Sequence, residues 1–77
     1  MTNFTSLTVG ETAEVVGYDP TEKSYRRKLL SMGLTKGTSF TLTKVAPMGD
    51  PVEIEVRGFK LSLRKNEANV LQIRKVK

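Results

Sequence analysis

The chain has 77 residues, enough for one domain with one small hydrophobic core, so we expect residues 1–77 to form a single domain. It contains no Cys and no His, which excludes disulfides, thiolate or imidazole metal sites and Cys–His or Ser–His nucleophiles. A domain this small also has little room for the deep pocket of a self-contained enzyme. We therefore expect no catalytic residue and no cofactor.

Lys and Arg number 13 against eight Asp and Glu, for a net charge of +5, and the charge is unevenly distributed. Every charged residue in 1–22 is acidic, whereas 23–77 carries all the basic ones. Such a chain could meet nucleic acid, anionic lipid or an acidic protein, or simply be soluble, and charge alone does not decide. No apolar run is long enough to span a membrane, and the first residues lack the features of a secretion signal, so we expect a cytoplasmic location.

Residues 13–18 form the first, somewhat irregular strand, because Val15 and Val16 are adjacent rather than alternating. A helix over about residues 20–32 follows. Asp19 is placed to cap it, with Pro20 at its first position and an acid three residues after the cap. Gly33 supplies the left-handed residue that ends a helix.

Within this helix, Tyr25, Leu29 and Met32 share one stripe, which we expect to face the core. Leu30 lies off the stripe beside Arg26. It is either a residue at the rim of the core or an apolar contact for a partner, surrounded by arginines.

Three further strands are expected over residues 40–45, 52–57 and 59–64, and a last one near 71–74. The runs on either side of Gly58 form a tight hairpin with one apolar and one charged face, and Phe59 is in phase with the apolar face. Five short strands separated by dense turn signals predict a mainly β fold, a small antiparallel five-stranded barrel with one inserted helix.

The segment Pro47–Pro51 separates two of these strands. It reads as a hairpin loop, with Gly49 for an unusual backbone angle and Met48 exposed at its tip. The alternative is a rigid recognition loop.

The carboxylates are the remaining candidates for a metal site. Asp50, Glu53 and Glu55 could hold a divalent cation weakly through oxygen. The competing interpretation is an acidic solvent face whose members pair with Lys60 or Arg64 on the next strand. Because the chain has no His or Cys, we expect no tight metal site.

Nucleic-acid binding by a small barrel needs aromatic platforms on a basic face. Tyr25, Phe40 and Phe59 are in phase with the core, which leaves too few aromatic residues for base stacking. A face that reads only phosphates stays open as an alternative. Its residues would be Arg57, Lys60, Arg64, Lys65, Arg74 and Lys75.

Three motifs in order carry a family resemblance. Residues 26–34, followed by Gly37, resemble the helix and turn of the ferrous iron transport protein A (FeoA) family. Residues 46–51 look like that family's hairpin loop, and residues 57–65 like its next strand pair. The similarity covers about residues 7–76, nearly the whole chain.

The resemblance implies an SH3-like small barrel with an inserted helix and a small cytoplasmic accessory of bacterial ferrous iron uptake. It also implies a partner, the large membrane permease with a GTP-binding domain, ferrous iron transport protein B (FeoB). The protein would then lie at the inner face of the membrane through its partner, without inserting. The family offers no catalytic residue to carry over.

From the chain's own exposed candidates we expect partner contacts at Arg26, Arg27 and Leu30 in the helix, and at Pro47, Met48 and Asp50 in the loop. The arginines would steer towards acidic groups, and Leu30 and Met48 would supply apolar contact. Alternative functions are regulation of the permease GTPase by an arginine supplied in trans, and a basic barrel that binds nucleic acid.

Overall fold

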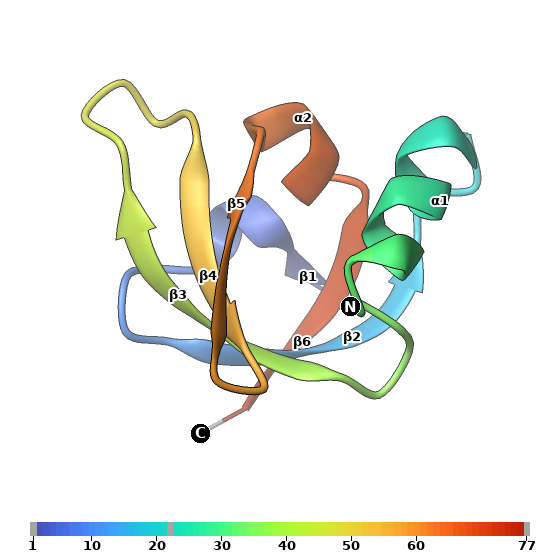
Figure 1. Cartoon of the computed structure of the whole chain (residues 1–77), viewed down its shortest axis with the longest axis horizontal. Helices are drawn as coiled ribbons and strands as arrows, with labels where there is room; N and C mark the ends of the chain where they lie inside the picture. The colour runs from blue at the N-terminus through green and yellow to red at the C-terminus, as the bar shows by residue number, and fades with distance from the viewer. Residues whose placement is uncertain (1, 22, 77) are drawn as a thin grey trace.

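The computed structural model describes residues 2–21 and 23–76, in which six strands and two α-helices form a compact, barrel-like arrangement (Figure 1). A 3₁₀ turn, η1, spans Phe4–Ser6. The helices are α1 (Lys23–Ser31) and α2 (Lys65–Ala68). The strands are β1 (Thr2–Asn3), β2 (Thr12–Tyr18), β3 (Ser39–Val45), β4 (Val52–Val56), β5 (Phe59–Leu63) and β6 (Leu71–Val76).

All neighbouring strands are antiparallel, in the order β1-β6-β2-β3-β4-β5. The register shifts between Val15 and Gly17 in β2, and between Leu42 and Lys44 in β3. Such bulges bend and twist a strand, which lets a sheet this small coil around its own core. The five long strands confirm the predicted mainly β, SH3-like barrel; the two-residue β1, which pairs with β6, was not predicted.

The core follows from strand alternation. In β2 the buried positions are Ala13, Val15 and Gly17, so Val16 points outward although it is as apolar as Val15. Phe4 of the 3₁₀ turn stacks on Phe40 of β3, with ring centroids 5.8 Å apart and planes 9° from parallel. The N-terminal segment is therefore part of the core rather than an appendage.

Helix α1 begins at Lys23, so the prediction that Asp19 caps it and Pro20 opens it is wrong. The Asp19 carboxylate instead accepts hydrogen bonds from the backbone N–H and the hydroxyl of Thr21, at 2.9 and 2.7 Å. These two bonds form a local turn in which the Asp19 carboxylate finds its donors at residue 21, before the helix starts. The capping acid expected at Glu22 lies outside the described residues.

The end of α1 is as predicted. Gly33 has a φ of +89°. Its N–H bonds to the Leu30 carbonyl, and the Leu34 N–H bonds to the Leu29 carbonyl. These two bonds form a Schellman motif, and Leu29 and Leu34 are both fully buried, which supplies the apolar contact that accompanies it.

Two features of the second half differ from the sequence prediction. Phe59, expected on the core face, is 72% exposed. It has the same phase as Leu61 and Leu63, but it adjoins the two-residue turn, where the hairpin extends past the core. The short helix α2 was not predicted. Within the described residues, no helix is long and apolar enough to cross a membrane.

Candidate functional site

Helix α1 carries three of the predicted partner contacts, and its position against the barrel leaves them accessible. Leu29 anchors the helix in the core, whereas Leu30, one residue on, is 40% exposed. Arg26 and Arg27 are both exposed on the preceding turn. The stripe prediction is confirmed, because Tyr25 and Met32 pack partly buried against the same core as Leu29.

Arg26 is held in place by an aromatic ring. Its guanidinium carbon lies 5.5 Å from the centre of the Tyr18 ring, the distance of a cation–π contact. The Tyr18 hydroxyl donates a hydrogen bond to the Leu34 carbonyl, just past the end of α1. Burial raises the pKa of Tyr18 above its ordinary value, and the Arg26 charge counteracts part of that rise. The Tyr18 ring thus restrains the Arg26 guanidinium, which holds its positive charge in place on the surface.

The loop between β3 and β4 carries the other predicted contacts. Met48 is 91% exposed at the tip, as predicted, and Pro47 is exposed beside it. The loop is closed by backbone bonds from the Gly49 N–H to the Ala46 carbonyl (2.7 Å) and from the Ala46 N–H to the Pro51 carbonyl (3.1 Å). A closed loop loses less conformational freedom when it binds a partner.

Helix α2 joins these two groups. On one side Asp50 of the loop accepts a bond from the Lys65 backbone N–H at 3.0 Å. On the other side the buried Glu67 accepts a bond from the Lys28 ammonium of α1 at 2.5 Å. Figure 1 shows α1, α2 and the loop at the same end of the barrel. We call this the helix–loop surface; it consists of α1, α2 and residues 46–51.

Glu67 is a buried carboxylate of this surface, and its pKa departs from the ordinary value. Its pKa is lowered chiefly by the hydrogen bond from Lys28, helped by the Arg64 backbone N–H at 3.1 Å and opposed by burial. Sequence reasoning missed both α2 and the role of Glu67. A signal was available, because an acid three residues after Arg64 matches the acidic half of a capping box.

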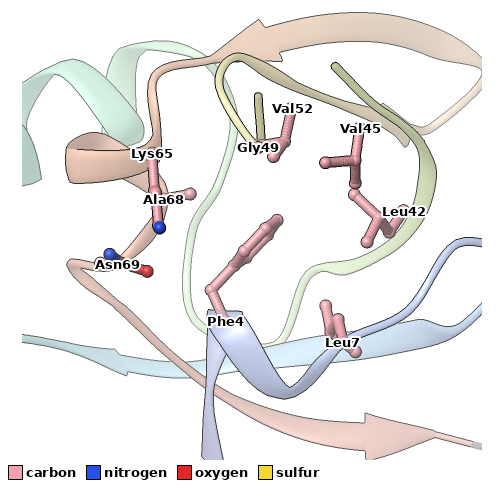
Figure 2. A pocket seen from close by; sticks show the side chains of 9 residues that line it. All are labelled: Phe4, Leu7, Leu42, Val45, Gly49, Val52, Lys65, Ala68 and Asn69. Carbon is pink, nitrogen blue, oxygen red and sulfur yellow. The ribbon is translucent and has the colours of Figure 1, made fainter. Parts of the chain in front are cut away.

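An apolar cavity of about 200 Å³ opens between the loop and α2. Figure 2 shows the Phe4 ring projecting into it, with Val45 and Val52 opposite and Lys65 and Asn69 at the α2 side. Val45 is 39% exposed although it is a large apolar residue. The remaining lining residues are Leu7, Leu42, Gly49 and Ala68. The cavity has the size and lining to receive one apolar side chain from a partner.

The three weak metal candidates do not converge. Asp50 bonds to the start of α2, Glu53 accepts a bond from the Thr43 hydroxyl at 2.9 Å, and Glu55 is exposed opposite Lys60. Among the described residues, no three His, Cys, Asp or Glu side chains are grouped so as to hold a metal ion. The cross-strand position of Glu55 and Lys60 matches the competing interpretation of an acidic solvent face.

The features expected of a nucleic-acid surface are sparse. All five aromatic residues are described, and Phe59 alone is exposed. Of the candidate basic face, Arg74 pairs with Glu14 at 2.5 Å and Lys75 lies 3.6 Å from Glu11. These pairs reduce the positive charge that β6 offers to phosphate.

Comparison with known proteins adds a family assignment. The model of the FeoA domain matches residues 2–75. Among solved structures, a FeoA-like protein from Clostridium acetobutylicum is 35% identical with a TM-score of 0.88, covering 99% of this chain and 91% of its own. The FeoA of Stenotrophomonas maltophilia, described as a prokaryotic SH3 domain protein and solved with zinc, is 21% identical with a TM-score of 0.80, covering 96% of this chain and 91% of its own; at that identity the likeness concerns the fold.

One curated relative is much larger. A protein of Porphyromonas gingivalis, named as a fusion of Fe(2+) transport protein A with the Fe(2+) transporter FeoB, is 31% identical over 49 residues. The match covers 64% of this chain and 6% of the relative, so this chain corresponds to a small part of that protein.

Proposed function

This chain belongs to the FeoA domain family, and from that membership we propose that it is a non-enzymatic accessory of ferrous iron uptake that docks on a membrane iron permease of the FeoB type. The contact would be made on the cytoplasmic side of the membrane by the helix–loop surface. The chain would support transport by binding one conformation of the permease more tightly than another, which requires differential affinity and no catalysis.

The P. gingivalis fusion is the observation that supports this partner. Two units in one polypeptide are held at high effective concentration, so a contact between them needs little intrinsic affinity. For a separate chain, the same contact must come from a surface of its own. The helix–loop surface offers steering cations at Arg26 and Arg27 and apolar contacts at Leu30 and Met48.

The test replaces the charged and apolar contacts of α1 together. The variant Arg26→Glu, Arg27→Glu, Leu30→Asp is expected to lose co-purification with the permease and to lower ferrous iron uptake in cells. The matched control is Arg74→Glu with Lys75→Glu, which reverses two charges on β6, outside the helix–loop surface, and breaks their ion pairs with Glu14 and Glu11. Both variants are checked for folding by thermal unfolding. If the α1 variant binds and transports as the wild type does, the proposed surface is wrong.

A second experiment distinguishes docking from regulation of the permease GTPase. GTP hydrolysis by the isolated GTP-binding domain of the permease is measured with and without this chain. A supplied arginine that stabilised the transition state would raise the turnover by orders of magnitude, whereas docking alone leaves it unchanged. We expect no change.

A further inference from the structure

Among the described residues, the edge of β5 that faces away from β4 pairs with no other strand. β5 stands at one end of the sheet order, and within the described residues it pairs only with β4. The two-residue turn Arg57–Gly58 has φ values of +52° and +84°, as in the tight turns that match strand twist. The flanking pair Val56–Phe59 therefore exchanges backbone bonds, as does every second pair from it.

This register decides which backbone groups are left over. Phe59, Leu61 and Leu63 bond to β4, so the N–H and C=O groups of Lys60 and Ser62 point away from it. Both residues are exposed. No backbone bond from the outer edge of β5 to another element is present among the described residues. Such an edge is a template for one more strand.

A groove of about 320 Å³ lies along this edge, between β5 and the end of α1. In Figure 1, β4 lies on one side of β5 and α1 on the other. Phe59 and Leu61 of β5 and Met32, just after α1, provide apolar lining, and Phe59 is largely exposed. The Arg57 side chain bonds to the Thr38 hydroxyl at 3.3 Å, which fixes it at the groove's end.

The charged residues that line this groove are all basic. Arg57 and Lys60 line the groove, which has no carboxylate among its described lining residues, and Arg64 follows β5 directly. Two acids of β4, Glu53 and Glu55, lie opposite Ser62 and Lys60, so a strand added at the outer edge of β5 would be two strand spacings from both, about 10 Å. At that distance Lys60 dominates.

From these features we propose that β5 binds an extended segment of a partner protein by strand addition, a segment in which acidic and apolar residues alternate. The acids would face Lys60 and Arg64, and the apolar side chains would lie over Phe59, Leu61 and Met32. A second copy of this chain fits poorly, because pairing β5 with itself gathers Lys60 and Arg64 of both copies on one face. This site borders the helix–loop surface, because Arg64 directly precedes α2, but it uses the edge of β5, which is not part of that surface.

The probe is a synthetic peptide of alternating Glu and Val, about eight residues long, matched by one of alternating Lys and Val. We expect the acidic peptide to bind the full chain, and the amide protons of Lys60 and Ser62 to become the ones most slowed in hydrogen exchange. The basic peptide should not bind. Equal binding of both peptides, or slowed exchange confined to other residues, would overturn the proposal.

The matched variants are Ser62→Pro and Ser62→Thr. Proline removes the outward N–H of Ser62 without touching a bond to β4, a position at which edge strands accept it. Affinity for the acidic peptide should fall by about tenfold or more in Ser62→Pro and stay unchanged in Ser62→Thr. Unchanged affinity in a folded Ser62→Pro variant contradicts the proposal. If that variant fails to fold, Phe59→Ala takes its place, with the same loss expected and the same outcome against it.

Two other occupants would show themselves in the same experiments. If oligo-dT binds in preference to the acidic peptide and shifts the NMR signals of Phe59 and Lys60, the edge binds single-stranded nucleic acid. Slowed exchange at Lys60 and Ser62 that grows with protein concentration, without peptide, would mean self-association. Either result counts against the proposed partner.

Discussion

At the scale of single residues, the interactions that hold the helix–loop surface together are few and specific. Glu67 serves two partners at once, the Arg64 backbone N–H and the Lys28 ammonium, and a buried carboxylate needs both because it has left water. Lys28 itself is 55% exposed, so its pair with Glu67 contributes less than a fully buried one would. The Arg26–Tyr18 contact fixes the opposite edge of α1.

Glu67→Gln tests the charge of this carboxylate while keeping an acceptor for the Arg64 N–H. The folded pKa lies below the ordinary value of 4.5, so Glu67 stabilises the fold above pH 4.5, and the contribution is lost as pH falls through the folded pKa. The variant should be about 1 kcal/mol less stable near neutral pH and nearly equal to the wild type in strong acid. Urea unfolding across this range measures it. Glu55→Gln, on the solvent face, is the control. If the free energies of unfolding of the wild type and Glu67→Gln differ by the same amount at every pH, the proposed role of the Glu67 charge is wrong.

At the scale of elements, backbone conformation decides where α1 ends and how the chain returns to the barrel. Gly33 adopts a left-handed conformation that completes both bonds of the Schellman motif, which sends Leu34 into the core. A side chain there would have space, because an added Cβ would meet only the Arg57 guanidinium at 3.8 Å. Any cost of substitution therefore comes from the backbone.

Gly33→Ala should lower the free energy of unfolding by about 1 kcal/mol, because an L-residue pays a steric penalty at positive φ. Gly33→Asn should lose less, since asparagine tolerates this region better. Denaturant midpoints of the two variants and the wild type make the comparison. An Ala variant as stable as the Asn variant would show that the end of α1 rearranges instead.

At the scale of the whole molecule, one small core has to hold strands from both ends of the chain. Phe4 is 5% exposed, stacks on Phe40 and forms a wall of the cavity in Figure 2, so the first segment closes the barrel beneath the loop. Phe59, by contrast, contributes its surface to solvent beside the open edge of β5. Phenylalanine thus packs in the core at position 4 and lies on the exposed surface at position 59.

Phe4→Ala should therefore destabilise the protein by about 3 kcal/mol, a large share of the few kcal/mol that a domain of this size possesses. Phe59→Ala should stay within about 0.5 kcal/mol of the wild type. Thermal and urea unfolding of the pair give the answer. Comparable losses in both variants would place Phe59 in the core after all.

The sequence alone determined the barrel and the end of its helix. Alternation in residues 52–64 and the glycine at position 33 act through near neighbours, so they can be read without the fold. The start of α1 could not be read this way, because Asp19 satisfies itself in a local turn. The contact residues predicted in α1 and the loop are all exposed as expected, and the Asp50 carboxylate in addition bonds to the start of α2.

Only the tertiary structure decided which surfaces these residues form. The Lys28–Glu67 bond joins positions 39 residues apart, and the Asp50–Lys65 bond joins positions 15 apart, so no local pattern records either. The exposure of Phe59 likewise cannot be read from the local sequence pattern. Its phase is that of a core residue, but exposure depends on where the core stops, and the packing of the other strands sets that boundary.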